Sequence, residues 1–538
     1  MSIFSSNKVR KLKTSRFDLS HTNLLTTKFG ELIPFMFMDC VPGDKVRLKS
    51  EMLVKFAPMI APIMSEIDIM TWYFKVPYRL VWDNFEDFIT GGRLGTSEPT
   101  FPTFEFTRAQ QKGTYKAFLG TSSLCDYFGV PNFQGADTAE NQQQTIKFSQ
   151  LPFRAYQLIY NDYFRDQNLE NELVIPKSNG NITLNSDFGT MNRMLTIRQK
   201  KFKKDYFTSA LPWAQRYGNE EVTVPLTGRM EVMLDDEGGT QRQKLVNGDG
   251  VAIPNSGLIT DGSGETQSNL DPNGTLYTDF DQQGVGLNIQ DLRYSNALQR
   301  WLENNARFGS RYIEQILARF GIRSSDARLQ RPELVGGGIQ NVMISEIMQQ
   351  SQSTDTSPQG NRSGDANSFG IHRSYKDVFC EEHCMIIGIM SIVPKSLYFQ
   401  GLPKHLTKFD RFEFFNPEFQ TLGEQPIKNS EIWFSGNPEA DNATFGYTPR
   451  YAEYKFKLGE IHGDFKESLD FFHMARMFNN RPALNNTFIS VGDDDYERIW
   501  AVQKDAEGNE TEFSRCWVQI YNNVKAKRPM MYNPNPSL

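Results

Sequence analysis

The sequence predicts a mainly β fold, a single eight-stranded antiparallel jelly roll (β-sandwich) with long loop insertions containing several helices. Strand patterns occur at residues 45–77 and return after His383, so strands from both ends of the chain flank long insertions. This is the arrangement of a jelly roll, in which late strands pair with early ones. Aromatic residues make up 13% of the 538 residues, which suits sheet faces and subunit interfaces better than a lean helical bundle. We therefore expect one elaborated jelly-roll domain over residues 1–538.

The chain starts with a basic arm at residues 1–20, although the protein as a whole is acidic. No acid precedes Asp18. The cations of the arm are Lys8, Arg10, Lys11, Lys13 and Arg16. Such an arm can contact phosphates, and a solvated, poorly ordered terminus is the alternative interpretation. These five cations are candidate nucleic-acid contacts.

Two different strand patterns occupy residues 45–77. Apolar and charged residues alternate over residues 45–56, which predicts a strand with one buried and one exposed face. Apolar and aromatic residues fall on both parities over residues 67–76, which predicts a central strand covered on both sides. Pro58 and Pro62 cannot donate ladder hydrogen bonds, so the segment between the strands is expected to be a crossing loop.

Helices and loops are expected next. Apolar spacing predicts a short amphipathic helix over residues 82–89. Residues 92–141 are rich in Gly, Pro, Thr and Phe, which predicts long surface loops with one small helix. Residues 152–168 place three tyrosines and Ile159 on one helical face, which predicts a core helix or, alternatively, an interface helix.

A second basic segment, residues 198–206, interleaves cations with Phe202 and Tyr206. Its cations are Arg198, Lys200, Lys201, Lys203 and Lys204. Single-stranded nucleic acid binds such arrangements, because cations contact phosphates and aromatic rings stack on bases. A solvated charged loop is the alternative interpretation. These five cations are also candidate nucleic-acid contacts.

Residues 221–286 differ in composition from the rest of the chain. Asp, Gly, Asn, Gln and Thr dominate, aromatic residues are few, and turn pairs recur. Short strand patterns at residues 221–226 and 230–234 predict an ordered surface insertion with hairpins. We expect this insertion to face outward, because it has little to bury.

The next part of the chain is predicted to be helical and then polar. Apolar spacing predicts two helices between residues 291 and 320. The three glycines at residues 336–338 predict a loop that enters a strand, and they lack the Lys-Ser/Thr pair of a phosphate loop. Residues 349–368 are polar and predict a mobile loop.

Strand patterns return in the last third of the chain. Residues 383–393 are apolar on both parities, residues 451–458 alternate, and residues 517–524 close the series. These late strands are the ones expected to pair with the early strands and to complete the sandwich.

Charge and cysteine content limit the classes of function. The formal net charge of −6 argues against a protein that coats nucleic acid over its whole surface, so any contact must be local. The cysteines are odd in number and widely spaced, which predicts free thiols in a reducing cytoplasm. They are Cys40, Cys125, Cys380, Cys384 and Cys516. No signal peptide or membrane-spanning stretch is recognised, so we expect a protein made in solution, with no membrane insertion.

No cluster of residues predicts catalysis, a cofactor or a metal site. Cys380, His383 and Cys384 superficially offer metal ligands, but no second Cys or His pair lies at a workable sequence distance. The adjacent acids at residues 381–382 and 493–495 fit a solvated turn better than a catalytic pair. We therefore expect no enzyme.

Several blocks of the sequence carry a family resemblance. They are SRFDLSH (15–21), VPGD (41–44), WYFKVPYRLVWDNFEDF (72–88), DYFTSALPWAQ (205–215), SDARLQRPELVGGG (325–338), EHCMIIGIMSIVP (382–394), FGYTPRYAEYKFKLGEIHGDF (445–465) and LNNTFI (484–489). In these blocks the chain resembles the major capsid protein of the Microviridae, small circular single-stranded DNA bacteriophages, and specifically the gokushovirus type. The blocks span nearly the whole chain in the expected order.

The resemblance implies a structural protein of the virion. It implies that copies assemble in the bacterial host cytoplasm, through pentamer intermediates, into a T=1 icosahedral shell around circular single-stranded DNA. It also implies that residues 221–286 form a protrusion at the three-fold axes that binds a host cell-surface receptor. A small, highly basic DNA-binding phage protein is an implied partner, which fits a shell too acidic to neutralise packaged DNA alone.

The alternative from another class is a secreted β-rich protein that binds carbohydrate or cleaves glycans. The aromatic content and the paired acids suggest it, and the missing signal peptide counts against it.

Overall fold

The computed structural model describes residues 13–92, 94, 96–113, 115–134, 138, 141–214, 289–308, 317, 325–326, 330–348, 362–492, 494–501 and 514–533, and four short strands between residues 229 and 279. The chain divides into two compact units. The first comprises Met1–Ala214 and Phe308–Leu538, and the second comprises Gln215–Arg307.

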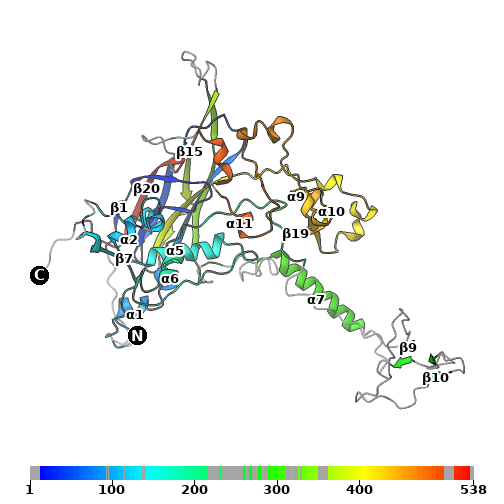
Figure 1. Cartoon of the computed structure of the whole chain (residues 1–538). Helices are drawn as coiled ribbons and strands as arrows, with labels where there is room; N and C mark the ends of the chain where they lie inside the picture. The colour runs from blue at the N-terminus through cyan, green and yellow to red at the C-terminus, as the bar shows by residue number, and fades with distance from the viewer. Residues whose placement is uncertain are drawn as a thin grey trace. The chain divides into compact units, whose positions relative to one another are not determined.

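One large antiparallel sheet of eleven strands forms the centre of the first unit (Figure 1). Its strands are β1 (Ser15–Asp18), β2 (His21–Thr27), β3 (Ile33–Cys40), β4 (Lys45–Phe56), β5 (Ile67–Pro77), β13 (Glu333–Asn341), β14 (Met343–Met348), β15 (Arg362–Ser374), β16 (Val378–Phe379), β17 (Cys384–Pro394) and β20 (Cys516–Arg528). The continuous order is β1-β20-β4-β15-β13-β5-β17-β3, and β2, β16 and β14 pair with β20, β4 and β15. The mainly β prediction is confirmed, and this curled sheet, with strands from both ends of the chain, is consistent with a jelly roll with insertions.

β4 and β5 have the burial that their sequences predict. In β4 the even-numbered side chains are buried and the odd-numbered ones are exposed or half-buried. β5 pairs with β13 on one side and β17 on the other, and almost all of its residues are buried. The late strands are confirmed as well, because β17 is buried throughout and β20 pairs with β1, β2 and β4.

The two ends of the sheet share one apolar core. Residues of β4 and β20 pack together with residues of β3, β5 and β17. A buried chain of hydrogen bonds crosses this core: the Tyr73 hydroxyl of β5 donates to Ser50 Oγ of β4 at 2.6 Å, and Ser50 donates to Asn522 Oδ1 of β20 at 2.6 Å. The edge of the Phe35 ring packs on Tyr73 with 5.7 Å between ring centres. Early and late strands thus form one sandwich.

Residues 103–195 form a second layer that packs on the sheet. The layer contains β6 (Thr103–Thr107), β7 (Thr145–Ser149), β8 (Asn181–Thr183), α2 (Arg108–Lys112), α3 (Lys116–Leu119), α4 (Leu124–Tyr127), α5 (Leu151–Ile159) and α6 (Phe188–Leu195). Its core joins Phe74 and Ile387 of the sheet to Phe104, Phe153 and Tyr156.

The prediction of surface loops with one small helix over residues 92–141 is therefore wrong, because β6 and three short helices bury their apolar side chains here. The core-helix interpretation of residues 152–168 is confirmed by α5 and the π-helical turn Tyr160–Phe164. The helix predicted over residues 82–89 exists as α1 (Phe85–Thr90), but none of its residues is buried.

A lobe after residue 400 contains β18 (Glu424–Lys428), α9 (Asn429–Ile432), α10 (Pro438–Asn442), β19 (Thr444–Pro449) and α11 (Asn486–Ile489). The strand predicted over residues 451–458 is wrong. Tyr451 has a left-handed backbone with φ of 60°, and the 3₁₀ turn Ala452–Tyr454 follows. Tyr454 and Phe456, which the alternation predicts on the buried face of a strand, stay exposed. The Lys408 ammonium lies 3.7 Å from the Tyr454 ring centre.

Two further expectations need correction. The glycines at residues 336–338 lie inside β13 and are no loop. A Cβ atom on Gly336 would lie 2.4 Å from the Ser374 backbone, and one on Gly337 would lie 2.3 Å from the Thr71 carbonyl oxygen, so these glycines permit close approach of neighbouring strands. Residues 362–368, expected in the polar loop, belong to β15, and residues 349–361 lie outside the described part of the chain.

α7 (Ile289–Phe308) confirms the first helix predicted after the insertion, whereas only Leu317 of the second is described. Within the insertion, β9 (Arg229–Glu231) pairs with β12 (Tyr277–Asp279), and β10 (Leu258–Thr260) pairs with β11 (Thr266–Ser268). β9 overlaps the strand predicted at residues 230–234, and the one predicted at 221–226 lies outside the described residues. Of the helices that are described, none has both the length and the apolar character of a membrane span.

Candidate nucleic-acid interface

The basic segment at residues 198–206 follows α6 and is held by backbone hydrogen bonds on two sides. The Lys200 N–H donates to the Gly30 carbonyl oxygen at 2.6 Å, and the Phe202 N–H donates to the Ile489 carbonyl oxygen at 2.9 Å. The segment therefore links the start of the chain to α11, and its side chains reach acids on both sides.

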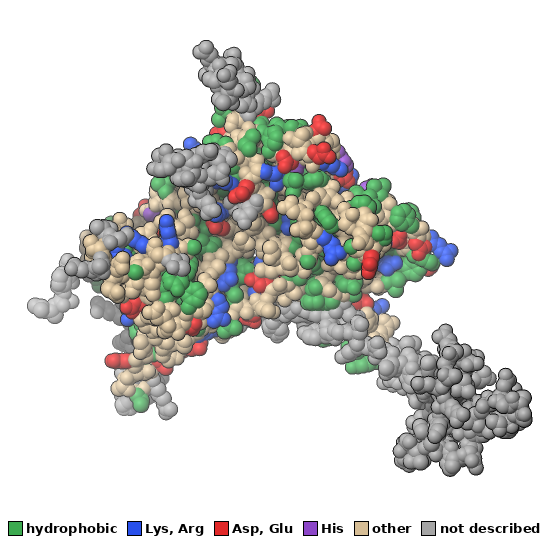
Figure 2. Space-filling model, in the orientation of Figure 1, with side chains coloured by type: hydrophobic (Ala, Val, Ile, Leu, Met, Phe, Trp, Pro, Cys, Tyr) green, Lys and Arg blue, Asp and Glu red, His purple; other side chains and the backbone are tan. Residues whose placement is uncertain are grey.

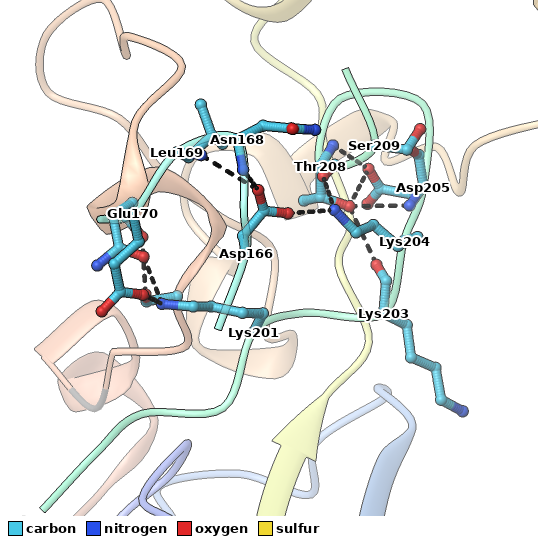
Figure 3. Close-up of polar contacts among 12 residues, drawn as sticks. Asp166, Asn168, Leu169, Glu170, Lys201, Lys203, Lys204, Asp205, Thr208 and Ser209 are labelled. Carbon is cyan, nitrogen blue, oxygen red and sulfur yellow. Dashed lines mark hydrogen bonds and ion pairs between the residues drawn. The ribbon is translucent and has the colours of Figure 1, made fainter. Parts of the chain in front are cut away.

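Lys201 is the most buried cation of this segment, with 7% of its surface exposed. Its Nζ lies 3.2 Å from Glu170 Oε2, donates to Ser490 Oγ at 2.9 Å and also donates to Asn486 (Figure 3). Glu170 accepts a further hydrogen bond of 2.6 Å from the Tyr160 hydroxyl. All three N–H donors of the Lys201 ammonium therefore have partners within the chain.

Lys203 and Lys204 pair with two buried carboxylates. Lys203 pairs with Asp68 of β5, and the Lys204 Nζ lies 2.7 Å from Asp166 Oδ2 (Figure 3). Burial acts to raise the pKa of Asp166, but the Lys204 charge and backbone hydrogen bonds outweigh it and hold that pKa below its usual range. The pair with Lys204 therefore favours the ionised form of the Asp166 carboxylate.

Lys200 and Arg198 lie against aromatic rings. The Lys200 Nζ lies 5.9 Å from the Trp72 ring centre and 5.7 Å from that of Phe164. Burial, helped by the charges of the neighbouring lysines, lowers the pKa of Lys200 to about 8. The Arg198 Nε donates to Gln157 Oε1 at 2.8 Å. Both cations are half-buried.

The two aromatic rings of the segment point into the protein. Phe202 and Tyr206 are 3% and 5% exposed. The Arg476 guanidinium lies 4.6 Å from the Phe202 ring centre, and the Tyr206 hydroxyl donates to Glu431 at 2.7 Å. The structure thus brings the five predicted cations together but leaves neither ring open to stack on a base.

The basic arm is described only at its end. Lys8, Arg10 and Lys11 lie outside the described residues. Lys13 is exposed, and Arg16 is exposed on β1, opposite Lys527 of β20. β1 therefore leads the arm onto the edge of the large sheet.

The outward face of β1, β20, β4 and β15, here called the basic sheet face, was missed by sequence reasoning. The register places Arg16, Lys527 and Lys45 side by side, and Lys49 beside Arg373. The cations of this face are Arg16, Lys45, Arg47, Lys49, Lys55, Arg373, Lys525 and Lys527, and its carboxylates are Asp18, Glu51, Asp365 and Asp377. The face is thus positively charged on a chain whose net charge is −6.

Exposed aromatic rings share this face. Trp517 and Tyr521 of β20 are each 41% exposed, and Phe369 of β15 is 64% exposed. Trp517 is directly opposite Lys55, and Phe369 is opposite Leu53 on the same strand, β4. Ring surfaces and cations therefore alternate along neighbouring strands, the arrangement that single-stranded nucleic acid binds.

Several cations of this face have no acidic partner in the described part of the chain. Arg47 pairs with Asp377 at 2.9 Å and Lys49 with Glu51 at 2.6 Å. In contrast, no carboxylate among the described residues lies within ion-pair distance of Lys55, Arg373 or Lys527. One open pocket is lined by five cations and two carboxylates, Arg16, Lys45, Arg47, Lys525, Lys527, Asp18 and Asp377. Phosphate groups bound there would meet an excess of positive charge.

The lobe after residue 400 exposes many apolar side chains, and Figure 2 shows hydrophobic groups over the lobe that carries α9 and α10. Phe409 is 87% exposed. Other exposed members are Leu406, Phe412, Phe414, Phe415, Leu422, Phe434 and Tyr454. Large exposed apolar surfaces mark protein–protein contacts.

Two of the residues weighed as catalytic or metal candidates, Glu382 and His383, have other partners. Glu382 pairs with Arg79 at 2.7 Å, and Asp493 lies outside the described residues. The His383 ring packs against Phe85 with 5.9 Å between ring centres. All five cysteines are buried thiols.

Comparisons with known proteins agree over the length of the chain. The family described as "Capsid protein (F protein)" matches residues 5–538. The chain is 34% identical to the capsid protein VP1 of Bdellovibrio phage phiMH2K over 495 residues, covering 88% of this chain and 87% of that protein. It is 31% identical to the capsid protein VP1 of Chlamydia phage 1 over 556 aligned positions, covering 90% of each. It is also 27% identical to the capsid protein VP1 of Spiroplasma virus 4, covering 99% of this chain and 97% of that protein.

Proposed function

The chain belongs to the phage capsid protein (F protein) family, and from this premise we propose that its copies close into a T=1 shell around circular single-stranded DNA, with the basic sheet face turned toward the DNA. It is a major capsid protein, a structural component of the virion that assembles with copies of itself. This membership favours a structural role over the secreted carbohydrate-binding or glycan-cleaving alternative, and we propose no catalytic activity.

The basic sheet face is the observation that carries the DNA contact. It offers eight cations against four carboxylates, and it also offers exposed Trp517, Tyr521 and Phe369 rings. Cations that neutralise phosphates supply affinity, and base stacking on rings adds contacts that tolerate any sequence. Packaged genomic DNA requires such tolerance.

The predicted contacts extend this face. The arm cations Lys8, Arg10, Lys11, Lys13 and Arg16 would reach the same DNA, because β1 joins the arm to the face. Of the segment Arg198, Lys200, Lys201, Lys203 and Lys204, only Lys203 and Lys204 have side chains that are half or more exposed, at 50% and 59%. We propose these two as weak secondary contacts only, because each ammonium already pairs with a carboxylate of the chain. A small basic phage protein would supply the charge that the acidic shell lacks.

The remaining surfaces are assigned to assembly and attachment. The exposed apolar side chains of the lobe suit contacts between copies, formed through pentamer intermediates in the bacterial host cytoplasm. Residues 221–286 are proposed to form the three-fold protrusion and to bind a host cell-surface receptor. Deleting residues 230–280 should give shells that assemble but do not adsorb to host cells, and normal adsorption would contradict this role.

The DNA contact is tested by neutralising the pocket cations together, as Lys45→Gln, Lys525→Gln and Lys527→Gln. Particles of this variant should form but contain less DNA, measured by sedimentation and ultraviolet absorbance. The matched control is Lys203→Gln with Lys204→Gln, which also removes cations but leaves the sheet face intact. Full DNA content in the first variant, or a greater loss of DNA in the control, would show that the DNA contact does not lie on the basic sheet face.

A further inference from the structure

Three cysteines from distant parts of the sequence meet inside the first unit. Cys40 ends β3, Cys380 follows β16 and Cys384 begins β17. Their Sγ atoms all lie within 4.8 Å of one another, and each residue is at most 2% exposed. The register explains part of this cluster, because Cys384 is directly opposite Cys40 in the β17–β3 pairing.

The third thiol is placed by backbone hydrogen bonds. The Cys380 N–H donates to the Asp44 carbonyl oxygen at 3.0 Å, and the Gly43 N–H donates to the Cys380 carbonyl oxygen at 2.8 Å. This reciprocal pair holds Cys380 against the turn that follows Cys40. All three positions are thus set by main-chain geometry, so the cluster does not depend on mobile side chains.

The surroundings of the cluster suit a bound cation with anionic ligands. The Asp44 carboxylate is fully buried, and its Oδ2 accepts from the Val41 N–H at 3.1 Å and lies 3.3 Å from Arg528 Nε. Its Oδ1 has no hydrogen-bond partner among the described residues. A buried carboxylate oxygen without a partner is costly, and a water molecule bound between it and a metal ion would satisfy it.

Two cations lie near the thiols. The Lys75 ammonium also pairs with Glu333 at 2.6 Å, and the Arg528 Nε lies 3.3 Å from Asp44 Oδ2. Three thiolates and a divalent ion carry a net charge of about −1, which these shared cations partly offset. A small pocket beside Cys384 is lined by three acids and three cations, Glu333, Glu381, Glu382, Lys75, Arg79 and Arg331.

We propose that Cys40, Cys380 and Cys384 bind one zinc ion, with a water molecule as the fourth ligand. Tetrahedral zinc with Zn–S bonds of about 2.3 Å requires sulfur atoms roughly 3.8 Å apart, a separation within the observed limit. Binding displaces the thiol protons into solvent. The ion would tie the end of β3 to the start of β17 and to the loop after β16.

The zinc content of particles purified under reducing conditions without chelator tests this site. Inductively coupled plasma mass spectrometry should find about one zinc per chain. Cys380→Ser should lose the zinc, whereas Cys125→Ser, which alters a buried cysteine outside the cluster, should retain it. Absence of zinc from wild-type particles even after incubation with zinc, or equal zinc in both variants, would overturn the proposal.

A second measurement uses the wild-type chain, so it stands even if the variants do not fold. A mercurial reagent should release zinc, detected with a metallochromic dye, in proportion to three thiols modified per ion. Cobalt substituted for zinc should give thiolate-to-cobalt absorption. A Cys40–Cys384 disulfide found by mass spectrometry of untreated particles would show an oxidised pair in place of a metal site and would reject the proposal, which does not depend on the DNA contact.

Discussion

Two regions of this chain mix cations with aromatic rings, and they use the same chemistry in opposite ways. In the segment at residues 198–206, Lys201, Lys203 and Lys204 each pair with a carboxylate of the chain, and both rings are buried. On the basic sheet face, rings are exposed and several cations have no acidic partner among the described residues. The first region stabilises the fold, and the second is proposed to meet DNA.

The difference shows that composition alone does not decide function. The direction of the side chains decides whether the same residue types contact the protein itself or remain open to a ligand. A loop imposes no periodicity, so residues 198–206 can turn their cations toward buried acids. A strand sends alternate side chains to opposite faces, so Lys525 and Lys527 of β20 must share a face with Trp517 and Tyr521. The predictions below test this contrast, beginning with the largest expected effect.

Lys201→Met should break the structural region most strongly. The change leaves Glu170 buried without its cation, and removing one partner of a buried ion pair costs about 3 kcal/mol or more. Urea unfolding of the unassembled protein measures the loss. Lys527→Met is the control, and it should change the free energy of unfolding by less than about 0.5 kcal/mol because Lys527 is exposed on the sheet face. Comparable losses of unfolding free energy in the two variants would contradict the distinction between the segment at residues 198–206 and the basic sheet face.

Lys200→Met tests the burial of Lys200 through the pH dependence of folding stability. The pKa of Lys200 is about 8 in the folded protein against an ordinary value of 10.5, so between these values the unfolded chain binds a proton that the folded chain does not. Wild-type stability should therefore rise relative to Lys200→Met as the pH increases from about 8 to 10.5. The expected gain is about 2 kcal/mol, since cation–π contacts with two rings partly stabilise the charged form. Parallel stability curves for the two proteins would contradict the burial of this cation.

The sheet could be predicted from the sequence because the burial of strand faces sets the spacing of apolar residues. The alternation at residues 45–56 and the apolar run at residues 383–393 correspond to β4 and β17. Prediction from the sequence failed at residues 451–458, where Tyr454 and Phe456 alternate with charges but stay exposed on an irregular segment. It also failed at residues 92–141, because short helices bury isolated phenylalanines without a long repeat.

The candidate sites were likewise predictable from the sequence only in part. The basic segment was found from its composition, but its partners Asp68 and Glu170 lie far away in sequence and no spacing predicts them. The exposed parity of β4 and β20 could have revealed the basic sheet face, had the two strands been known to pair. Cys40 joins Cys380 and Cys384 only through the β3–β17 register, which the sequence alone does not supply.

Tyr521→Ala tests the proposed stacking on the sheet face. Base stacking on an aromatic ring contributes roughly 1–3 kcal/mol per base, and the lower end is expected because Tyr521 is only 41% exposed. Binding of a fluorescent oligothymidine by unassembled protein should weaken by about 1 kcal/mol. Tyr454→Ala removes an exposed ring from the lobe and should leave this binding unchanged. If both variants bind equally well, the rings of the sheet face do not stack on bases.

The smallest effect comes from a single cation, and it separates the two regions most directly. Each phosphate contact contributes about 0.7 to the slope of log affinity against log salt for single strands. Lys55→Gln should reduce the slope by about that amount, because Lys55 lies beside Trp517 with no acidic partner among the described residues. Lys55→Arg should restore it, since the charge is kept. Lys203→Gln should leave the slope nearly unchanged, because the Lys203 ammonium already pairs with Asp68, so a slope that changes only in this variant would assign the phosphate contact to the segment.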